Sequence, residues 1–231
     1  MTHEPRQNVT FRSNGGHAHG YRAVPPSGSG PALLVIQEWW GLDDHVADLV
    51  DRFAGEGFVA LAPDLYGGTV THDSDRASEL LAELPVERAV QDLSGAVDHL
   101  LFDPAVTSTR VGAVGFCIGG GFVLQLAAAR PDSVGAAVPF YGIGPGVPED
   151  YSSIRAPIQG HYAEQDTFYP VEQAKEQERD IRSQAGVPVE FFYYPAGHAF
   201  LNDKDLLNTY DADLAELAWR RAVTFLHQHL G

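Results

Sequence analysis

Apolar residues recur along the chain with two different periods, and these periods predict its helices and strands. Three segments carry apolar residues at the i, i+3, i+4 and i+7 positions of one helix face, at 46–53, 86–93 and 215–226. Shorter apolar runs bounded by glycine, proline or polar residues predict strands at 33–36, 58–62, 110–114, 134–140, 156–162 and 189–194. Strands that alternate with helices indicate an α/β protein with a mainly parallel sheet.

The N-terminal part of the chain departs from this alternation. Two runs, at 9–12 and 19–24, flank Asn14-Gly15-Gly16, a turn sequence that predicts an antiparallel hairpin. The Pro, Ser and Gly residues at 25–30 predict a surface loop before the next strand. We therefore expect a hairpin that leads into the parallel sheet, within one domain spanning residues 1–231, a length that can bury a substantial core.

The pentapeptide at 115–119, Gly-Phe-Cys-Ile-Gly, joins the strand at 110–114 to a helix predicted at 122–129. Small residues two positions before and after a central nucleophile are typical of a nucleophile elbow, a sharp turn in which larger side chains would collide with the neighbouring strand and helix. A dinucleotide-binding turn is the weaker alternative, because no acidic residue ends the following strand. Cys117, the only cysteine, is the predicted nucleophile; the alternative is a buried thiol that packs as a small hydrophobe.

A nucleophilic thiol needs a histidine base and an acid that orients the base, and after an elbow they follow in the order acid, then histidine. Asp166 and His198 each lie in the loop that leaves the C-terminal end of a predicted strand. Because the carboxyl ends of parallel strands meet at one edge of the sheet, we expect Cys117, Asp166 and His198 to lie together. Glu164, in the same loop, is the alternative acid, but the shorter carboxylate of Asp166 fixes an imidazole more rigidly. His161 is expected to be structural.

Composition limits the remaining function classes. The net charge of −16 and the isoelectric point near 4.8 argue against nucleic acid and anionic membrane surfaces as partners, and this acidity is also compatible with a saline habitat. The first residues lack the apolar core of a signal peptide, and no segment approaches the length of a membrane span. A single cysteine excludes an internal disulfide. We expect a cytoplasmic protein, either a monomer or a small homo-oligomer.

No metal or other cofactor is expected from the sequence. His17 and His19 alternate as two ligands on one strand would, but no third ligand accompanies them, and a surface strand explains the pair better. The expected partner is therefore a small-molecule substrate, and the reaction is expected to use only groups of the protein.

Several blocks of sequence together resemble the dienelactone hydrolase family along nearly the whole chain. They lie at 35–41 (VIQEWWG), 62–67 (APDLYG), 114–120 (VGFCIGG), 161–166 (HYAEQD), 196–200 (AGHAF) and 202–203 (ND). The resemblance implies an α/β-hydrolase fold, with helices on both faces of a mainly parallel eight-stranded sheet. It also implies a triad of Cys117, Asp166 and His198 that opens the lactone ring of dienelactones, compounds formed during degradation of aromatic compounds.

The same resemblance assigns a role to Glu38. The matching glutamate of the family contacts the cysteine and helps to generate the thiolate only when substrate is bound, which would protect a lone cysteine from oxidation. The alternative is a solvated loop glutamate. The backbone N–H groups of Trp39 and Ile118 are expected to form the oxyanion hole. Tyr141 and the Trp39-Trp40 pair are expected to line an aromatic pocket, although core packing would explain them as well.

The chain departs from the family where the substrate carboxylate would bind. Well-studied members have an arginine shortly after the catalytic histidine, whereas residues 199–203 here are Ala-Phe-Leu-Asn-Asp. Arg76 is the only cation between Tyr66 and Pro85 that could take its place, and acidic residues lie close to it in the sequence. We therefore expect weak activity on dienelactone and preference for neutral substrates. A non-catalytic or redox-sensing thiol protein on the same scaffold is the alternative function.

Overall fold

The computed structural model describes residues 6–142, 144 and 146–231, and its centre is one eight-stranded sheet. The strands follow one another in the chain as β1 (Val9–Ser13), β2 (Gly16–Ala23), β3 (Gly30–Ile36), β4 (Val59–Pro63), β5 (Val106–Phe116), β6 (Val134–Phe140), β7 (Ile158–Ala163) and β8 (Val189–Tyr194). Their order across the sheet is β1-β2-β4-β3-β5-β6-β7-β8.

The sheet is parallel from β4 to β8, and only the N-terminal hairpin is antiparallel. Strand β1 pairs with β2, and β2 pairs with β4, both antiparallel. The other five pairings are parallel. The predicted hairpin, the predicted fold class and its mainly parallel sheet are thereby confirmed. Because β3 to β8 run in one direction, their carboxyl ends lie along one edge of the sheet, where the predicted site residues follow.

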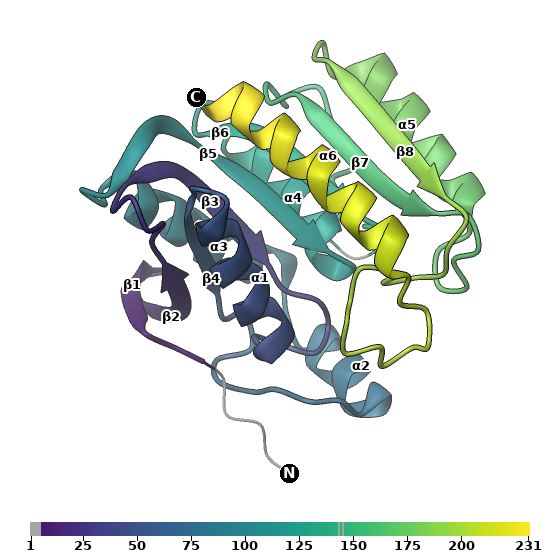
Figure 1. Cartoon of the computed structure of the whole chain (residues 1–231), viewed down its shortest axis with the longest axis horizontal. Coiled ribbons are helices and arrows are strands. Elements are labelled where there is room, and N and C mark those ends of the chain that lie inside the picture. The colour runs from purple at the N-terminus through teal and green to yellow at the C-terminus, as the bar shows by residue number, and fades with distance from the viewer. Residues whose placement is uncertain (1–5, 143, 145) are drawn as a thin grey trace.

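Helices cover both faces of the sheet (Figure 1). On one face α1 (Asp44–Gly55) and α6 (Ala212–Leu230) pack together, with Phe53 of α1 and Trp219 of α6 4.1 Å apart between ring centroids. The other face holds α3 (Val86–Leu101), α4 (Ile118–Ala129) and α5 (Val171–Gln184). The short helix α2 (Ser74–Ala82) lies beside the loops at the carboxyl edge (Figure 1).

Two helices, α2 and α5, were not predicted, and the reason is their polarity. Only Ala77 and Leu80 of α2 are buried, and α5 buries Ala174, Gln177 and Ile181. So few apolar positions produce no helical periodicity in the sequence. These helices are stabilised mainly by tertiary packing and by capping residues. The N-cap of α2 is Asp73, whose carboxylate accepts the Arg76 N–H.

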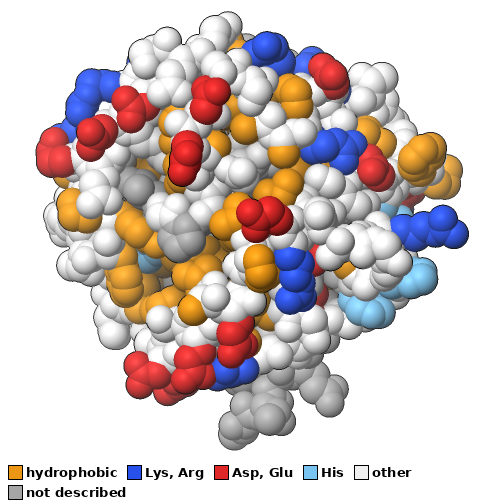
Figure 2. Space-filling model, turned by 180° about the vertical axis from the view of Figure 1, so that it is seen from behind, with side chains coloured by type: hydrophobic (Ala, Val, Ile, Leu, Met, Phe, Trp, Pro, Cys, Tyr) orange, Lys and Arg blue, Asp and Glu red, His pale blue; other side chains and the backbone are white. Residues whose placement is uncertain are grey.

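The acidic side chains are spread over the surface. Figure 2 shows Asp and Glu at several separate places on the rear face, with isolated Lys and Arg side chains among them and apolar side chains between. Within the part of the chain that the structure describes, no helix is both long and apolar enough to cross a membrane.

Candidate active site

Cys117 occupies the turn between β5 and α4. Its backbone has φ +55° and ψ −118°, a strained conformation for any residue other than glycine, and α4 begins at the next residue. The two flanking glycines allow this turn to form. A Cβ at Gly119 would lie 2.5 Å from the carbonyl oxygen of Ile36 and 2.6 Å from that of Gln37, and one at Gly115 would collide with the Gly119 backbone.

Backbone strain is concentrated around this turn. Among the described residues, those with positive φ that are neither Gly, Asn nor Asp are Cys117, Tyr141 and Ala199. Cys117 directly follows β5, and Tyr141 directly follows β6. Ala199 lies in the loop after β8, next to His198. Such strain persists only where the surrounding structure fixes it, and it gathers at functional sites.

The structure brings His198 and Asp166 together. His198 Nδ1–H donates to Asp166 Oδ2 over 2.7 Å, and both side chains are nearly inaccessible to solvent. Asp166 Oδ1 accepts the N–H groups of Phe168 and Tyr169, each over 2.8 Å, so the carboxylate is held in place from both sides. Glu164, the alternative acid, is exposed. With Nδ1 occupied, Nε2 is the nitrogen left for the Cys117 sulfur, whose negative charge acts on this imidazole.

The electrostatics of His198 favour a protonated ring. Burial by itself lowers the pKa of His198, but the negative charge on Cys117 and the hydrogen bonds to Asp166 and Cys117 more than offset it and raise the pKa to about 10. Burial together with the charge of the nearby Cys117 raises the pKa of Tyr169 to about 12. The surroundings of His198 therefore stabilise a protonated imidazole whenever the neighbouring sulfur carries a negative charge.

The two backbone amides predicted to form an oxyanion hole belong to neighbouring segments. Ile118 is the first residue of α4, so its N–H has no partner within the helix, and the helix dipole adds partial positive charge there. Trp39 lies in the turn that follows β3, the strand whose end packs against Gly119. Trp39 follows β3 and Ile118 follows β5, so the two predicted amides come from neighbouring strands at the carboxyl edge of the sheet.

Glu38 is buried, which argues against the solvated glutamate weighed above. Its Oε2 accepts the Asn202 side-chain N–H over 2.7 Å, and its Oε1 has no hydrogen-bond partner. Burial raises the pKa of Glu38, while the charge of His45, the Asn202 hydrogen bond and the charge of His198 act in the opposite direction. Tyr141 lies fully buried below His198, with ring centroids 5.1 Å apart, and its hydroxyl is likewise unpartnered although the Glu38 charge acts on it.

Arg76, the predicted substrate contact, lies exposed on α2. Its guanidinium pairs with Glu79 on the same helix over 2.8 Å. Aromatic side chains, by contrast, lie beside His198, the predicted base. The Phe168 ring, which is 47% exposed, lies 5.0 Å from the His198 ring and 5.9 Å from that of Trp39. Phe168 was not predicted, since a lone aromatic residue in a loop carries no periodic signal.

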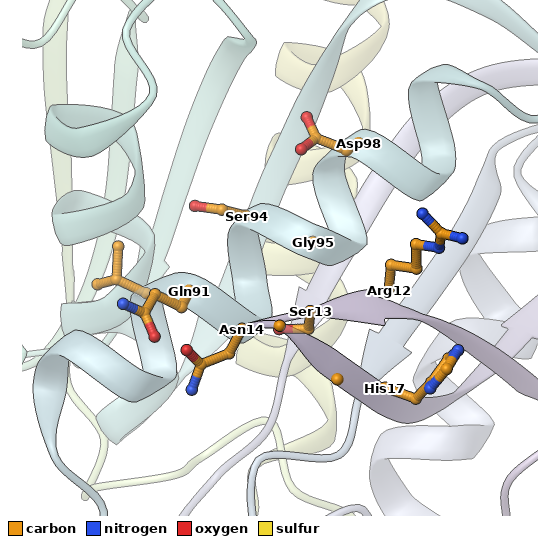
Figure 3. A pocket seen from close by; sticks show the side chains of 11 residues that line it. Arg12, Ser13, Asn14, His17, Gln91, Ser94, Gly95 and Asp98 are labelled. Atoms are coloured by element: carbon orange, nitrogen blue, oxygen red, sulfur yellow. The ribbon is translucent and has the colours of Figure 1, made fainter.

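The structure also contains a surface cavity of about 630 Å³ between the β1–β2 turn and α3, shown in Figure 3. None of the residues lining it belongs to the site described above. Its polar groups take part in structural contacts: Ser13 hydrogen bonds to Asp92, and Asp98 pairs with Arg130. The cavity is therefore separate from the predicted site residues. In the described ranges, no three His, Cys, Asp or Glu side chains are grouped so that they could bind a metal ion.

Comparison with known proteins identifies the family of this chain. The dienelactone hydrolase family profile matches residues 18–230. A protein of Aquifex aeolicus named "putative carboxymethylenebutenolidase" is 34% identical, covering 97% of this chain and 99% of its own. A crystal structure described as a "putative dienelactone hydrolase" of Klebsiella pneumoniae has a TM-score of 0.84 at 28% identity, covering 99% and 98% of the two chains.

A further structure in the comparison is the dienelactone hydrolase-like promiscuous phosphotriesterase P91 from metagenomic libraries. It has a TM-score of 0.82 at 26% identity and covers 98% of each chain. The match of the family profile to nearly the whole chain, together with a fold shared over nearly the full length of these structures, shows that this chain belongs to the dienelactone hydrolase family.

Proposed function

We propose that this protein hydrolyses small, uncharged carboxylic esters or lactones through a thioester on Cys117, with His198 and Asp166 completing a catalytic triad. Membership in the dienelactone hydrolase family makes it a carboxylic ester or lactone hydrolase. The observation that carries the proposal is that Asp166 holds one nitrogen of His198 over 2.7 Å, while the charge of Cys117, in a strained turn at the start of a helix, acts on the same ring.

The chemistry follows from this array. His198 Nε2 takes the thiol proton, and the Cys117 sulfur forms a bond to the carbonyl carbon while the carbonyl π electrons move onto oxygen. The amides of Ile118 and Trp39 stabilise that oxyanion. When the carbonyl reforms, the ester C–O bond breaks and the leaving alkoxide takes the His198 proton. His198 then deprotonates water, hydroxide attacks the thioester, and the acid product departs as sulfur regains its proton from the ring.

Glu38 has a regulatory part in this proposal. Its carboxyl lies buried beside the site, fixed by Asn202 and within electrostatic reach of His198. A carboxylate there disfavours a second permanent negative charge on the sulfur, so that the thiolate forms when substrate is bound. A lone cysteine that is a neutral thiol at rest oxidises more slowly.

The preference for uncharged substrates rests on the residues at two positions. Asn202 stands on the segment after His198, and its amide is engaged with Glu38. Arg76 is paired with Glu79. A charge-assisted bidentate contact contributes roughly 1.5–3 kcal/mol, so a substrate carboxylate that lacks one loses about ten- to a hundredfold in binding. The aromatic rings of Trp39 and Phe168 beside His198 offer apolar contact instead.

Turnover by the purified protein tests the reaction. We expect a neutral short-chain aryl ester to be hydrolysed, Cys117→Ala to abolish that turnover, and stoichiometric alkylation of the wild-type thiol to do the same. Full activity in Cys117→Ala would exclude the thiol mechanism. A folded wild type that turns over no ester or lactone and oxidises reversibly at Cys117 would favour the redox-sensing alternative.

A matched pair of substrates tests the charge preference. We expect kcat/KM for the neutral aryl ester to equal or exceed that for dienelactone, and Arg76→Ala to change neither. A strong preference for dienelactone that disappears in Arg76→Ala would show that Arg76 leaves Glu79 and binds the substrate carboxylate.

A further inference from the structure

Thr209 lies in the loop between β8 and α6, residues 195–211, which also carries His198 (Figure 1). Its hydroxyl donates to the backbone carbonyl oxygen of His198 over 2.5 Å. Sequence analysis did not single out this threonine, because a hydroxyl residue in a loop carries no periodic signal. The bond joins the last part of the loop to the backbone of the predicted base.

The backbone on either side of His198 supports a role for this contact. A Cβ at Gly197 would lie 2.6 Å from Thr209 Cγ2, so only glycine allows the backbone to approach the threonine this closely. Ala199 has φ +59°, a conformation that persists only where the surrounding structure holds it. Thr209 therefore packs against, and hydrogen bonds to, the constrained backbone that presents the imidazole.

Thr209 is itself held in place by Asp205. Asp205 Oδ1 accepts the N–H groups of Thr209 and Tyr210, over 2.8 and 2.9 Å. The Asp211 N–H donates to the Phe200 carbonyl over 3.1 Å and joins the two ends of this part of the loop. Because its own backbone is fixed by these bonds, the Thr209 hydroxyl can in turn fix the carbonyl that it contacts.

The same loop is anchored to α1. Asp203 Oδ1 bonds to His45 Nδ1 over 3.1 Å, and Lys204 Nζ pairs with Asp48 over 3.1 Å. Both partners belong to α1, a helix that packs against one face of the sheet. The loop that carries Thr209 is therefore tied to the body of the protein at positions between His198 and Thr209.

The remaining contacts of His198 leave a part for Thr209. Asp166 holds the ring at Nδ1 over 2.7 Å. The Gln165 N–H donates to the Ala196 carbonyl over 2.9 Å and so joins the loop of the acid to the loop of the base. These bonds fix one end of the ring and the backbone two residues before it, whereas Thr209 fixes the carbonyl of His198 itself.

We propose that Thr209 is a positioning residue of the reaction: its hydroxyl holds the His198 backbone so that the imidazole, bound to Asp166, stays directed at Cys117. The inference rests on the proposed function, because Thr209 acts through His198. A misplacement of about 1 Å at reacting groups costs on the order of 10²-fold in rate, and loss of one hydrogen bond allows a smaller shift, so the expected effect is about tenfold.

The test compares Thr209→Ala with Thr209→Ser, two variants that differ only in the hydroxyl group. We measure kcat and KM for the neutral aryl ester, together with urea unfolding. We expect kcat of Thr209→Ala to fall about tenfold with KM unchanged, and Thr209→Ser to keep most of the wild-type kcat. Thr224→Ala is the matched control, since that hydroxyl donates to the Arg220 carbonyl over 2.8 Å at an exposed position of α6 and its loss should leave kcat unchanged.

A second variant tests the support of Thr209 and replaces Thr209→Ala if that variant does not fold. Asp205→Ala removes the acceptor of the Thr209 and Tyr210 N–H groups, so kcat should fall with KM unchanged. Combined with Thr209→Ala it should add little, because both changes act on the same contact. Additive losses, equal kcat in Thr209→Ala and Thr209→Ser, or a fall matched by Thr224→Ala would overturn the inference.

A measurement on the resting protein separates the inference from the proposed function. The proton on His198 Nδ1 is hydrogen bonded to Asp166, and its NMR resonance depends on the geometry of that bond. We expect this resonance to move in Thr209→Ala and to keep its wild-type position in Thr209→Ser, whatever the nucleophile. An unmoved resonance in Thr209→Ala would overturn the inference, whereas activity in Cys117→Ala would overturn only the proposed function.

Discussion

Substitution of Gly119 by alanine tests whether the close approach of α4 to β3 positions the oxyanion hole. The added Cβ would lie 2.5 Å from the Ile36 carbonyl oxygen, whereas a carbon and a carbonyl oxygen approach to about 3.3 Å. The start of α4 must therefore retreat from β3 by about 0.8 Å. This motion carries the Ile118 amide away from the Trp39 amide, because the two belong to the segments that separate.

The expected effect is on kcat. A misplacement of about 1 Å at reacting groups costs on the order of 10²-fold in rate, and overpacking costs roughly 1–3 kcal/mol of stability. The assay measures kcat and KM for the neutral aryl ester together with urea unfolding. Gly55→Ala is the matched control, since a Cβ at that helical position meets nothing within 4 Å and alanine should slightly stabilise the helix. Wild-type kcat in a stable Gly119→Ala would refute the argument.

The remaining predictions concern the base and its acid. While Cys117 carries its negative charge, the pKa of His198 is raised to about 10, so the imidazolium that protonates the leaving alkoxide persists as pH rises past the ordinary histidine value; the activity that depends on this proton should fall only as pH rises through about 10. Asp166→Asn removes one of the causes of that rise, so the alkaline limb of kcat/KM should move to lower pH and kcat should drop; an unmoved limb would contradict the role of the hydrogen bond. His198→Ala should lower kcat by roughly 10²-fold or more, and chelators should leave the wild-type rate unchanged; loss of activity with chelator would indicate a metal in the reaction.

Sequence could predict those helices and strands whose own residues form an apolar run or a helical repeat, without information from the rest of the chain. The strands Val134–Phe140 and Val189–Tyr194 coincide with the predicted runs, since each is mainly apolar or aromatic, with Glu190 the one charged residue, and is bounded by polar residues or turns. Strand β5, predicted at 110–114, extends over Val106–Phe116, because its first part alternates polar residues at an exposed end of the sheet. Helix α4 begins at Ile118, four residues before the predicted start. The glycines that weakened the helical pattern are the residues that let the helix start against β3.

The candidate triad could be named from sequence because each of its members follows a strand. Topology then places strand ends together without any knowledge of side-chain contacts. The surroundings of Glu38 could not be predicted in this way. Asn202 hydrogen bonds to it from a loop 164 positions further along the chain, and His45, whose charge acts on it, comes from the first turn of a helix. Residues in a loop or in the first turn of a helix follow no hydrophobic periodicity, so the sequence does not show that they lie near Glu38.

Three buried histidines show what decides the charge of an imidazole in this protein. Burial lowers the pKa of each ring, and in His161, whose partners are the Tyr194 hydroxyl and the Gln159 amide, it lowers the pKa to about 3. His198 and His45 are buried to a similar degree, but each is hydrogen bonded to a carboxylate, and the pKa of each is raised. Depth of burial therefore does not decide the charge of a buried imidazole in this protein, whereas the presence of an acid partner does. Because His198 pairs with Asp166 at the carboxyl edge of the sheet, beside the Cys117 turn after β5, its proton is held where the proposed reaction needs it.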